Sequence, residues 1–168
     1  AEVVNKRGSD DSLIVAASSA TATRLAQGAY PGNTMDQVKW VGTIGADYGV
    51  IAVAGDSDVV TLGELLENLK TKPKKWVIGG GSAVGGWDHL KVLMAAKEYG
   101  ISNVRKIKYV SFDGGGDAVT QLLAGNVKIF TGDVSEIKGF VDAGDIKIIA
   151  VLSPDRLPGD FSKFYTAR

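Results

Sequence analysis

Hydrophobic and polar positions along the chain follow two different spacings. Short runs rich in Val and Ile are typical of buried strands, whereas apolar residues three or four positions apart indicate helices packed on one side. The runs of the first kind predict strands at residues 12–17, 40–44, 49–53, 76–78, 106–110, 127–130 and 147–152. Residues 1–6 have the pattern of a strand-and-loop segment.

Helices are predicted between these runs. One covers residues 22–27 and ends at Gly28, and another covers 87–99 and ends at Gly100, since glycine is a common residue just after a helix. Two helix starts carry capping boxes, in which a side chain and a backbone amide three residues apart bond each other in both directions. Thr61 and Glu64 form the first capping box, and the apolar stripe of its helix is Leu62, Leu65, Leu66 and Leu69. Asp133 and Glu136 form the second, and the stripe of its helix is Val134, Ile137, Phe140 and Val141. A further stripe is Ala118, Val119, Leu122 and Leu123.

Strands and helices alternate along most of the chain. This order predicts an α/β fold with βαβ units, a mainly parallel sheet and flanking helices. In such a sheet every loop from a strand into a helix lies at the carboxyl edge. We therefore expect four loops, around Ser18, Gly81, Asp113 and Asp133, to converge there.

The loop of residues 79–86 combines four features that suit a ligand site. It follows a strand, it is rich in glycine, it contains Ser82, and it opens a helix at Trp87. Glycine lets backbone amides approach a ligand closely, and the first amides of a helix attract negative charge. The residues alone therefore predict a small polar, anionic ligand bound at the helix starts.

Composition narrows the class of protein. The chain has 168 residues, enough for one domain or two small lobes, and its formal charge of zero gives no sign of a nucleic-acid or membrane-surface partner. It has no cysteine, which excludes disulfides and thiolate chemistry in these residues. No apolar run reaches the ~18–20 residues of a membrane-spanning helix.

Nucleotide-binding motifs are absent from the glycine-rich loop. Gly80 and Gly85 have the spacing of a phosphate-binding loop, but Gly86 and Trp87 stand where Lys and a hydroxyl residue belong. The dinucleotide motif fails because Val84 replaces its last glycine.

Two other chemistries stay open. His89 could act with a loop serine in a hydrolase or transferase, although no G-x-S-x-G motif is present. Carboxylates could hold a hard cation, although Asp also caps helix starts. The candidates for a metal are Asp88, His89, Asp113, Asp117 and Asp133.

The sequence resembles the solute-binding proteins of tripartite tricarboxylate transporters, the family that includes the Bug receptors. The similar stretches are residues 9–19 with their serine-rich loop, 38–53, 61–66, the glycine–serine loop 79–90 ending in His-Leu, 109–116, 119–127 and 146–158. The resemblance covers nearly the whole chain from Ser9 onward.

This resemblance implies a two-lobed periplasmic receptor with the type II periplasmic-binding-protein fold. Residues 1–49 and 153–168 then form an incomplete first lobe with the hinge, and residues 50–152 form the second lobe. The ligand is a small carboxylate, a tricarboxylate such as citrate, delivered to a membrane permease without catalysis, cofactor or metal, by a monomer. An effector-sensing module of the same fold is the other alternative. The implied ligand-binding residues are Ser18, Ser19, Ser82, Gly85, Gly86, Trp87, Asp113, Gly115 and Asp133.

The chain departs from the family pattern in two places. Residues 111–117 lack the usual proline of their loop. The family's first strand with its glycine-rich loop would precede Ala1, and its C-terminal helices would follow Arg168, so we expect the chain to correspond to a fragment.

Overall fold

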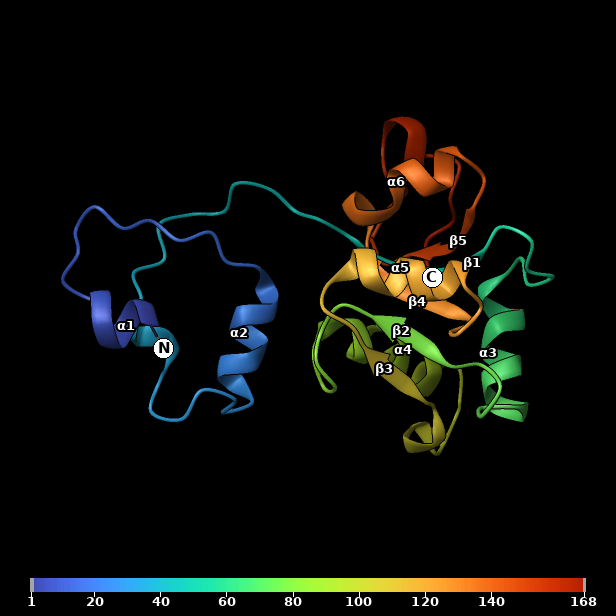
Figure 1. The fold of residues 1–168 in the computed structure, drawn as a ribbon, viewed down its shortest axis with the longest axis horizontal. Coiled ribbons are helices and arrows are strands. Elements are labelled where there is room, and N and C mark those ends of the chain that lie inside the picture. The colour runs from blue at the N-terminus through green and yellow to red at the C-terminus, as the bar shows by residue number, and fades with distance from the viewer. Residues whose placement is uncertain (1, 168) are drawn as a thin grey trace. The chain divides into compact units, whose positions relative to one another are not determined.

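The structure, a computed structural model, describes residues 2–167 in two compact units (Figure 1). The first unit ends at Ala46, and the second begins at Asp47.

The first unit contains short helices joined by extended segments. Its elements are α1 (Glu2–Arg7), α2 (Ser19–Ala26) and the 3₁₀ helix η1 (Met35–Gln37). The helix predicted at residues 22–27 is confirmed as the last turns of α2, and Gly28 follows with a φ of +67°. The strands predicted at residues 12–17 and 40–44 are wrong, as is the strand-and-loop segment at 1–6, which contains α1.

The two failed strands share one physical cause. A strand is stable only when its backbone groups pair with a neighbour, and the described part of the first unit contains no other strand. Ile14 and Ile44 are therefore exposed, at 89% and 102%. The Asp10 side chain also binds the Ser12 amide at 3.1 Å, which turns the chain before the first predicted strand.

The second unit is built on one five-stranded mixed sheet. Its strands are β1 (Gly49–Ala54), β2 (Ile78–Gly80), β3 (Tyr109–Ser111), β4 (Ile129–Asp133) and β5 (Ile146–Val151), in the order β3-β2-β4-β1-β5. The pairs β2–β3 and β2–β4 are parallel, while β1 is antiparallel to both β4 and β5. Four strands thus run in one direction, which confirms the mainly parallel sheet, and β1 runs against them.

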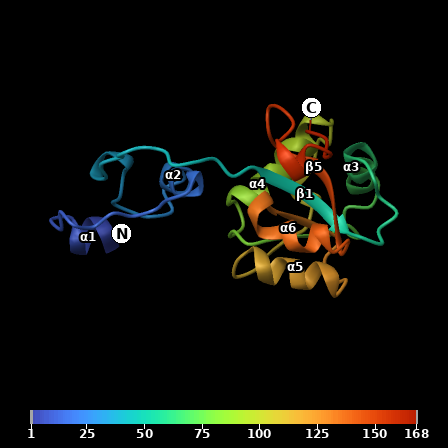
Figure 2. The ribbon, with the colours of Figure 1, turned by 90° about the horizontal axis from the view of Figure 1, so that it is seen from above.

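Helices cover both faces of this sheet (Figure 2). Helices α3 (Leu62–Thr71) and α4 (Trp87–Glu98) pack on Ile51 and Val53, and α5 (Gly115–Leu123) and α6 (Val134–Asp142) pack on Val50 and Ala52. Successive residues of β1 thus face opposite layers, as strand geometry requires. The start of α3 has the predicted capping box, with the Glu64 amide donating to Thr61 Oγ1 at 3.2 Å.

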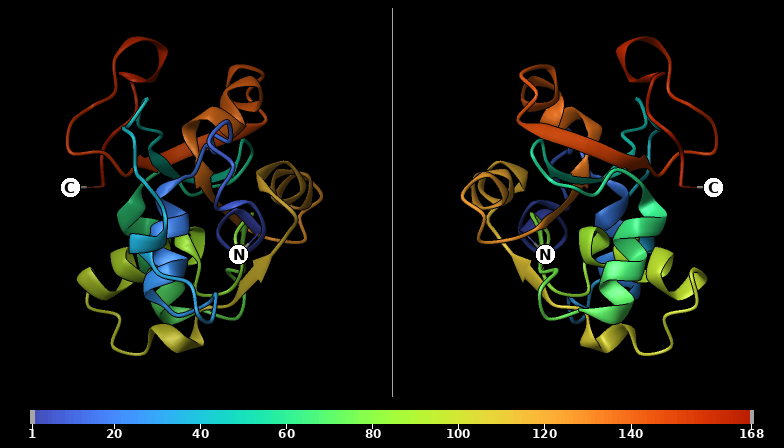
Figure 3. Two further views of the ribbon diagram at one scale, coloured as in Figure 1. Left: turned by 90° about the vertical axis from the view of Figure 1, so that its left-hand side faces the viewer. Right: turned by 90° about the vertical axis from the view of Figure 1, so that its right-hand side faces the viewer.

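The C-terminal segment lies beside β5 (Figure 3). Thr166 forms a parallel bridge with Val151, and Phe161 and Phe164 pack against the core on the α5 and α6 side. Residues 153–167 therefore pack with the second unit. The remaining short helices are η2 (Val104–Lys106) and η3 (Gly159–Phe161). Among the described helices, none has the length and apolar character needed to cross a membrane.

Candidate functional site

Three loops meet at the carboxyl ends of β2, β3 and β4. Gly80 is in register with Ser111 on one side and with Thr131 on the other, so β2 and β3 end at the same level and β4 continues for two more residues to Asp133. A Cβ placed on Gly81 would lie 2.6 Å from Gly115 N, which shows how closely the β2–α4 loop packs on the start of α5. The predicted convergence is confirmed for the loops at Gly81, Asp113 and Asp133. Ser18 and Ser19, at the start of α2, belong to the first unit.

The β2–α4 loop is fixed by its own hydrogen bonds. The Ser82 amide donates to Asp88 Oδ2 at 3.0 Å, and the Asp88 amide donates to Ser82 Oγ at 3.0 Å. The Tyr109 hydroxyl donates to the Ser82 carbonyl at 2.7 Å. Gly85 has a φ of +80°, a conformation that favours glycine. The predicted site residue Ser82 therefore lies at the meeting point, with its amide and hydroxyl already engaged by Asp88.

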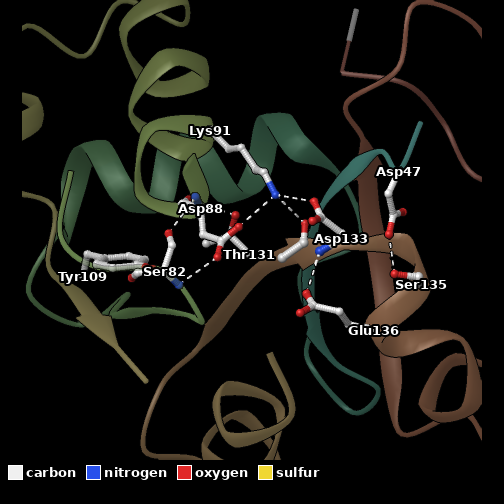
Figure 4. A network of polar contacts seen from close by, with 10 residues as sticks. Asp47, Ser82, Asp88, Lys91, Tyr109, Thr131, Asp133, Ser135 and Glu136 are labelled. Atoms are coloured by element: carbon white, nitrogen blue, oxygen red, sulfur yellow. Dashed lines mark hydrogen bonds and ion pairs between the residues drawn. The ribbon is translucent and has the colours of Figure 1, made fainter. Parts of the chain in front are cut away.

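A buried lysine ties this loop to the end of β4 (Figure 4). Lys91 Nζ lies 2.9 Å from Asp88 Oδ1, 2.7 Å from Asp133 Oδ1 and 2.8 Å from the Gly132 carbonyl. Its side chain is 0% exposed, and a Cβ on Gly49 would lie 2.8 Å from its stem. Both aspartates are ion-paired, and each of the three ammonium protons has an acceptor.

The carboxyl group of Glu136 fills the space between β4 and α5. Glu136 Oε2 accepts the Asp133 amide at 2.8 Å, which completes the predicted capping box of α6. A Cβ on Gly115 would lie 2.4 Å from Glu136 Cδ, so the carboxyl group covers this glycine. Loss of solvent contact raises the pKa of Glu136, with a smaller contribution from the negative charge of Asp133.

Backbone amides at two helix starts remain unpaired. Within residues 2–167, the amides of Trp87 and His89 at the start of α4, and those of Gly115 and Gly116 at the start of α5, have no hydrogen-bond acceptor. Gly86 caps α4 without a side-chain hydrogen bond. These groups and the helix dipoles favour an anion at this edge. Of the other predicted residues, Trp87 is partly exposed beside the Lys91 ammonium, and Asp113 is exposed in the β3–α5 loop.

The surroundings of His89 do not resemble those of a general base. Its Nδ1 accepts the Gly85 amide at 3.0 Å, and its ring stacks on Tyr109 with centroids 4.5 Å apart. Burial lowers the pKa of His89. Because Nδ1 already accepts the Gly85 amide, the neutral imidazole carries its proton on Nε2 and has no free nitrogen to take the proton of a serine hydroxyl.

Metal ligands do not gather at this edge in the described chain. Among residues 2–167, no three His, Cys, Asp or Glu side chains are placed to share one ion. Asp88 and Asp133 are candidate metal ligands in the sequence, but in the structure their carboxylates bind the Lys91 ammonium.

A hollow of about 540 Å³ lies between the loop and β3. Its walls include Val84, His89, Arg105, Lys108 and Tyr109, and none of Ser82, Asp88 or Asp133. It is wide open and mainly apolar, so we place the candidate site at the strand ends, where the unpaired amides are.

Lys91, Tyr109 and Glu136 are the contacts that sequence reasoning missed at this site. Lys91 follows Asp88 by three positions, a spacing that allows an ion pair on one face of a helix. That signal was present in the sequence, but a lysine within a helix is usually solvated, and nothing local shows that β4 passes beside it. Tyr109 reaches the loop through the register of β3 beside β2, and the predicted capping residue Glu136 contacts Gly115, which no local signal shows.

Comparison with known proteins places the chain in a family. A sequence model described as "Tripartite tricarboxylate transporter family receptor" matches residues 6–162. Comparison with curated protein sequences gave no match.

Solved structures show the same fold. A TctC solute-binding protein from Polaromonas is 27% identical with a TM-score of 0.62, over 71% of this chain and 39% of that one. A structure described as a periplasmic transporter is 21% identical with a TM-score of 0.70, over 89% and 49%. MatC from Rhodopseudomonas palustris, with bound malate, is 15% identical with a TM-score of 0.63, over 72% and 39%.

The chain therefore spans less than half the length of each of these structures. The similarity to these structures confirms the periplasmic-binding-protein fold implied by the sequence, present here in part. Since the family model covers most of the sequence, this chain belongs to the receptor family of the tripartite tricarboxylate transporters.

Proposed function

We propose that this chain supplies one wall of the ligand site in a periplasmic receptor that binds a small carboxylate, a tricarboxylate such as citrate. The receptor delivers the ligand to the permease of a tripartite transporter as a monomer, without catalysis. In this receptor, residues 50–152 form the second lobe, and residues 1–49 and 153–168 contribute to the first lobe and the hinge.

The observation that carries the proposal is the set of unpaired amides at the starts of α4 and α5. The contact between Gly81 and the Gly114–Gly115 backbone brings these two helix starts to the same edge. A carboxylate is the right size to accept from two amides, and each charge-assisted hydrogen bond strengthens binding by about 1.5–3 kcal/mol. The malate bound to MatC supports a carboxylate as the class of ligand.

The residues proposed to contact the ligand are those predicted from the sequence. In the second unit they are Ser82, Gly85, Gly86, Trp87, Asp113, Gly115 and Asp133. Ser18 and Ser19 of the first unit remain part of the proposal, as the serine-rich loop of the first lobe.

Isothermal titration calorimetry with citrate, malate, succinate and the uncharged tricarballylic acid trimethyl ester tests this function. We expect saturable heat from the carboxylates and none from the ester. The substitution Gly116→Pro removes one amide in the first turn of α5, where no intrahelical hydrogen bond is lost and no atom lies within 4 Å of the Cβ position. It should weaken carboxylate binding about tenfold or more while the melting temperature is kept. Equal heat from the ester, or no heat from any carboxylate, would refute the proposal.

A further inference from the structure

Lys91, Asp88, Asp133 and the Gly132 carbonyl form a cluster, which we call the Lys91 cluster. Its carboxylates can accept further hydrogen bonds, but its ammonium group has no proton left to donate. Lys91 gives its three protons to Asp88, Asp133 and the Gly132 carbonyl. Asp88 accepts from Lys91 with one oxygen and from the Ser82 amide with the other, and its side chain is 13% exposed. Asp133 differs, because its side chain is 37% exposed.

The carboxylate of Asp133 can accept further hydrogen bonds. A carboxylate has room for about four hydrogen bonds. One comes from Lys91, and the capping box of α6 provides one more from the Glu136 amide. An acceptor that is partly open to solvent is therefore left at the carboxyl end of β4.

The charge of the cluster has the same consequence. Two carboxylates, Asp88 and Asp133, face one ammonium group, so the cluster carries one net negative charge. A plain carboxylate held at the starts of α4 and α5 would lie near this charge without compensation, and like charges repel. A donor group on the ligand would compensate for the repulsion by binding Asp133.

The position of Asp133 fits this role. Its own ion-pair partner, Lys91, also binds Asp88, which lies between the two unpaired amides of α4. Its neighbour Gly132 flanks the Glu136 carboxyl group, which on its other side covers Gly115 at the start of α5. Asp133 is therefore connected to the start of α4 through Lys91 and Asp88, and to the start of α5 through the Glu136 carboxyl group.

We propose that the ligand of this site carries, besides its carboxylate, a hydroxyl or ammonium group that donates a hydrogen bond to Asp133. This inference rests on the proposed function and selects among carboxylates. Lys91 acts as a positioning residue, since its buried ammonium fixes the orientation of Asp133 and has no proton left for the ligand.

Matched pairs of ligands test the inference by calorimetry on the unmodified chain. Citrate and tricarballylate differ only in a hydroxyl group, as do malate and succinate, while aspartate and succinate differ in an ammonium group. We expect the member with the donor to bind about tenfold more tightly or better, the effect of one hydrogen bond to a charged acceptor. Malate against aspartate then distinguishes the hydroxyl from the ammonium.

Asp133→Asn connects the preference to its residue. The amide keeps an oxygen for Lys91 but loses the charge, so the preference should fall below about threefold. Asp117→Asn removes an exposed carboxylate of α5 and should leave the preference unchanged. A melting curve verifies that Asp133→Asn is folded. If this variant is unfolded, the affinities of the matched ligand pairs for the unmodified chain test the inference.

Three outcomes are decisive against the inference. Equal affinity within every pair overturns it and leaves the proposed function intact. Mg²⁺ that raises succinate to the affinity of malate also overturns it, because a cation would then satisfy Asp133. Absence of binding by all of these carboxylates refutes the proposed function, and the inference falls with it.

Discussion

Asp88 and Lys91, one turn apart in α4, connect the glycine-rich loop to the end of β4. Asp88 Oδ1 lies 2.9 Å from Lys91 Nζ, and its second oxygen accepts the Ser82 amide at 3.0 Å. Lys91 continues the chain of contacts to Asp133 at 2.7 Å. The orientation of the loop therefore depends on a charge that is fully buried beneath it.

Removal of the Lys91 ammonium group should lower the stability of the folded protein. Lys91→Met keeps the length of the side chain but leaves Asp88 and Asp133 without their cation, and removing one partner of a buried ion pair costs about 3–5 kcal/mol. We expect the free energy of unfolding to fall by about 3 kcal/mol, the lower end of this range, because Asp133 is partly exposed and can be solvated. Urea denaturation measures it. Lys97→Met, on the exposed side of the same helix, should change stability by less than about 0.5 kcal/mol. Equal losses of stability in Lys91→Met and Lys97→Met would show that the buried ion pairs of Lys91 do not stabilise the fold.

The close packing of the loops predicts opposite effects of alanine at two glycines. Gly81→Ala places a Cβ 2.6 Å from the backbone of Gly114 and Gly115, and overpacking of this kind costs about 1–3 kcal/mol. Gly139 lies within α6 with no atom within 4 Å of its Cβ position. Gly139→Ala should therefore stabilise the protein by about 0.5–1 kcal/mol, since alanine favours helix. Thermal denaturation compares the two, and stabilisation by Gly81→Ala would show that the loops are not in contact.

The second unit could be predicted from the sequence because its signals are local and agree with one another. The capping boxes at Thr61 and Asp133 and the apolar stripe of α3 gave the helix starts within a residue. The carboxyl ends of the strands then indicated the edge of the sheet where the candidate site lies. The reversed direction of β1 could not be predicted. The sequence of residues 49–53 predicts a buried strand, but it does not show which strands lie beside it or in which direction they run.

The failed predictions concern residues whose structure depends on distant partners. Residues 12–17 and 40–44 have the composition of strands, but Ile14 and Ile44 have no neighbouring strand to pack against in the described first unit. Lys91 shows the reverse case, since a residue that suits a solvated helix face is buried by β1 and β4. Periodicity reports local preference, whereas burial is decided by the tertiary neighbours.

His89 should be neutral at physiological pH, with its proton on Nε2. Its Nδ1 accepts the Gly85 amide, which leaves Nε2 to carry the proton, and burial lowers its pKa below the ordinary value of 6.5. Because the folded protein holds this proton more weakly than the unfolded chain, stability should fall as the pH decreases through and below that value. The sequence has a single histidine, so ¹⁵N-detected NMR gives both the tautomer and the titration without overlap. A proton on Nδ1, or a midpoint above 6.5, would contradict the contact with Gly85.

Glu136 should produce the opposite dependence on pH. Loss of solvent and the charge of Asp133 raise its pKa above the ordinary value of 4.5, although the Asp133 amide opposes the shift. The folded protein therefore binds this proton more strongly than the unfolded chain, and its contribution to stability decreases as the pH rises through the range above 4.5. Glu136→Gln keeps an oxygen for the Asp133 amide and cannot ionise. Its stability relative to the unmodified protein should increase from about pH 4 to about pH 7, as measured by urea denaturation at each pH. A difference that is constant over this range would show that the carboxyl group is solvated rather than enclosed between β4 and α5.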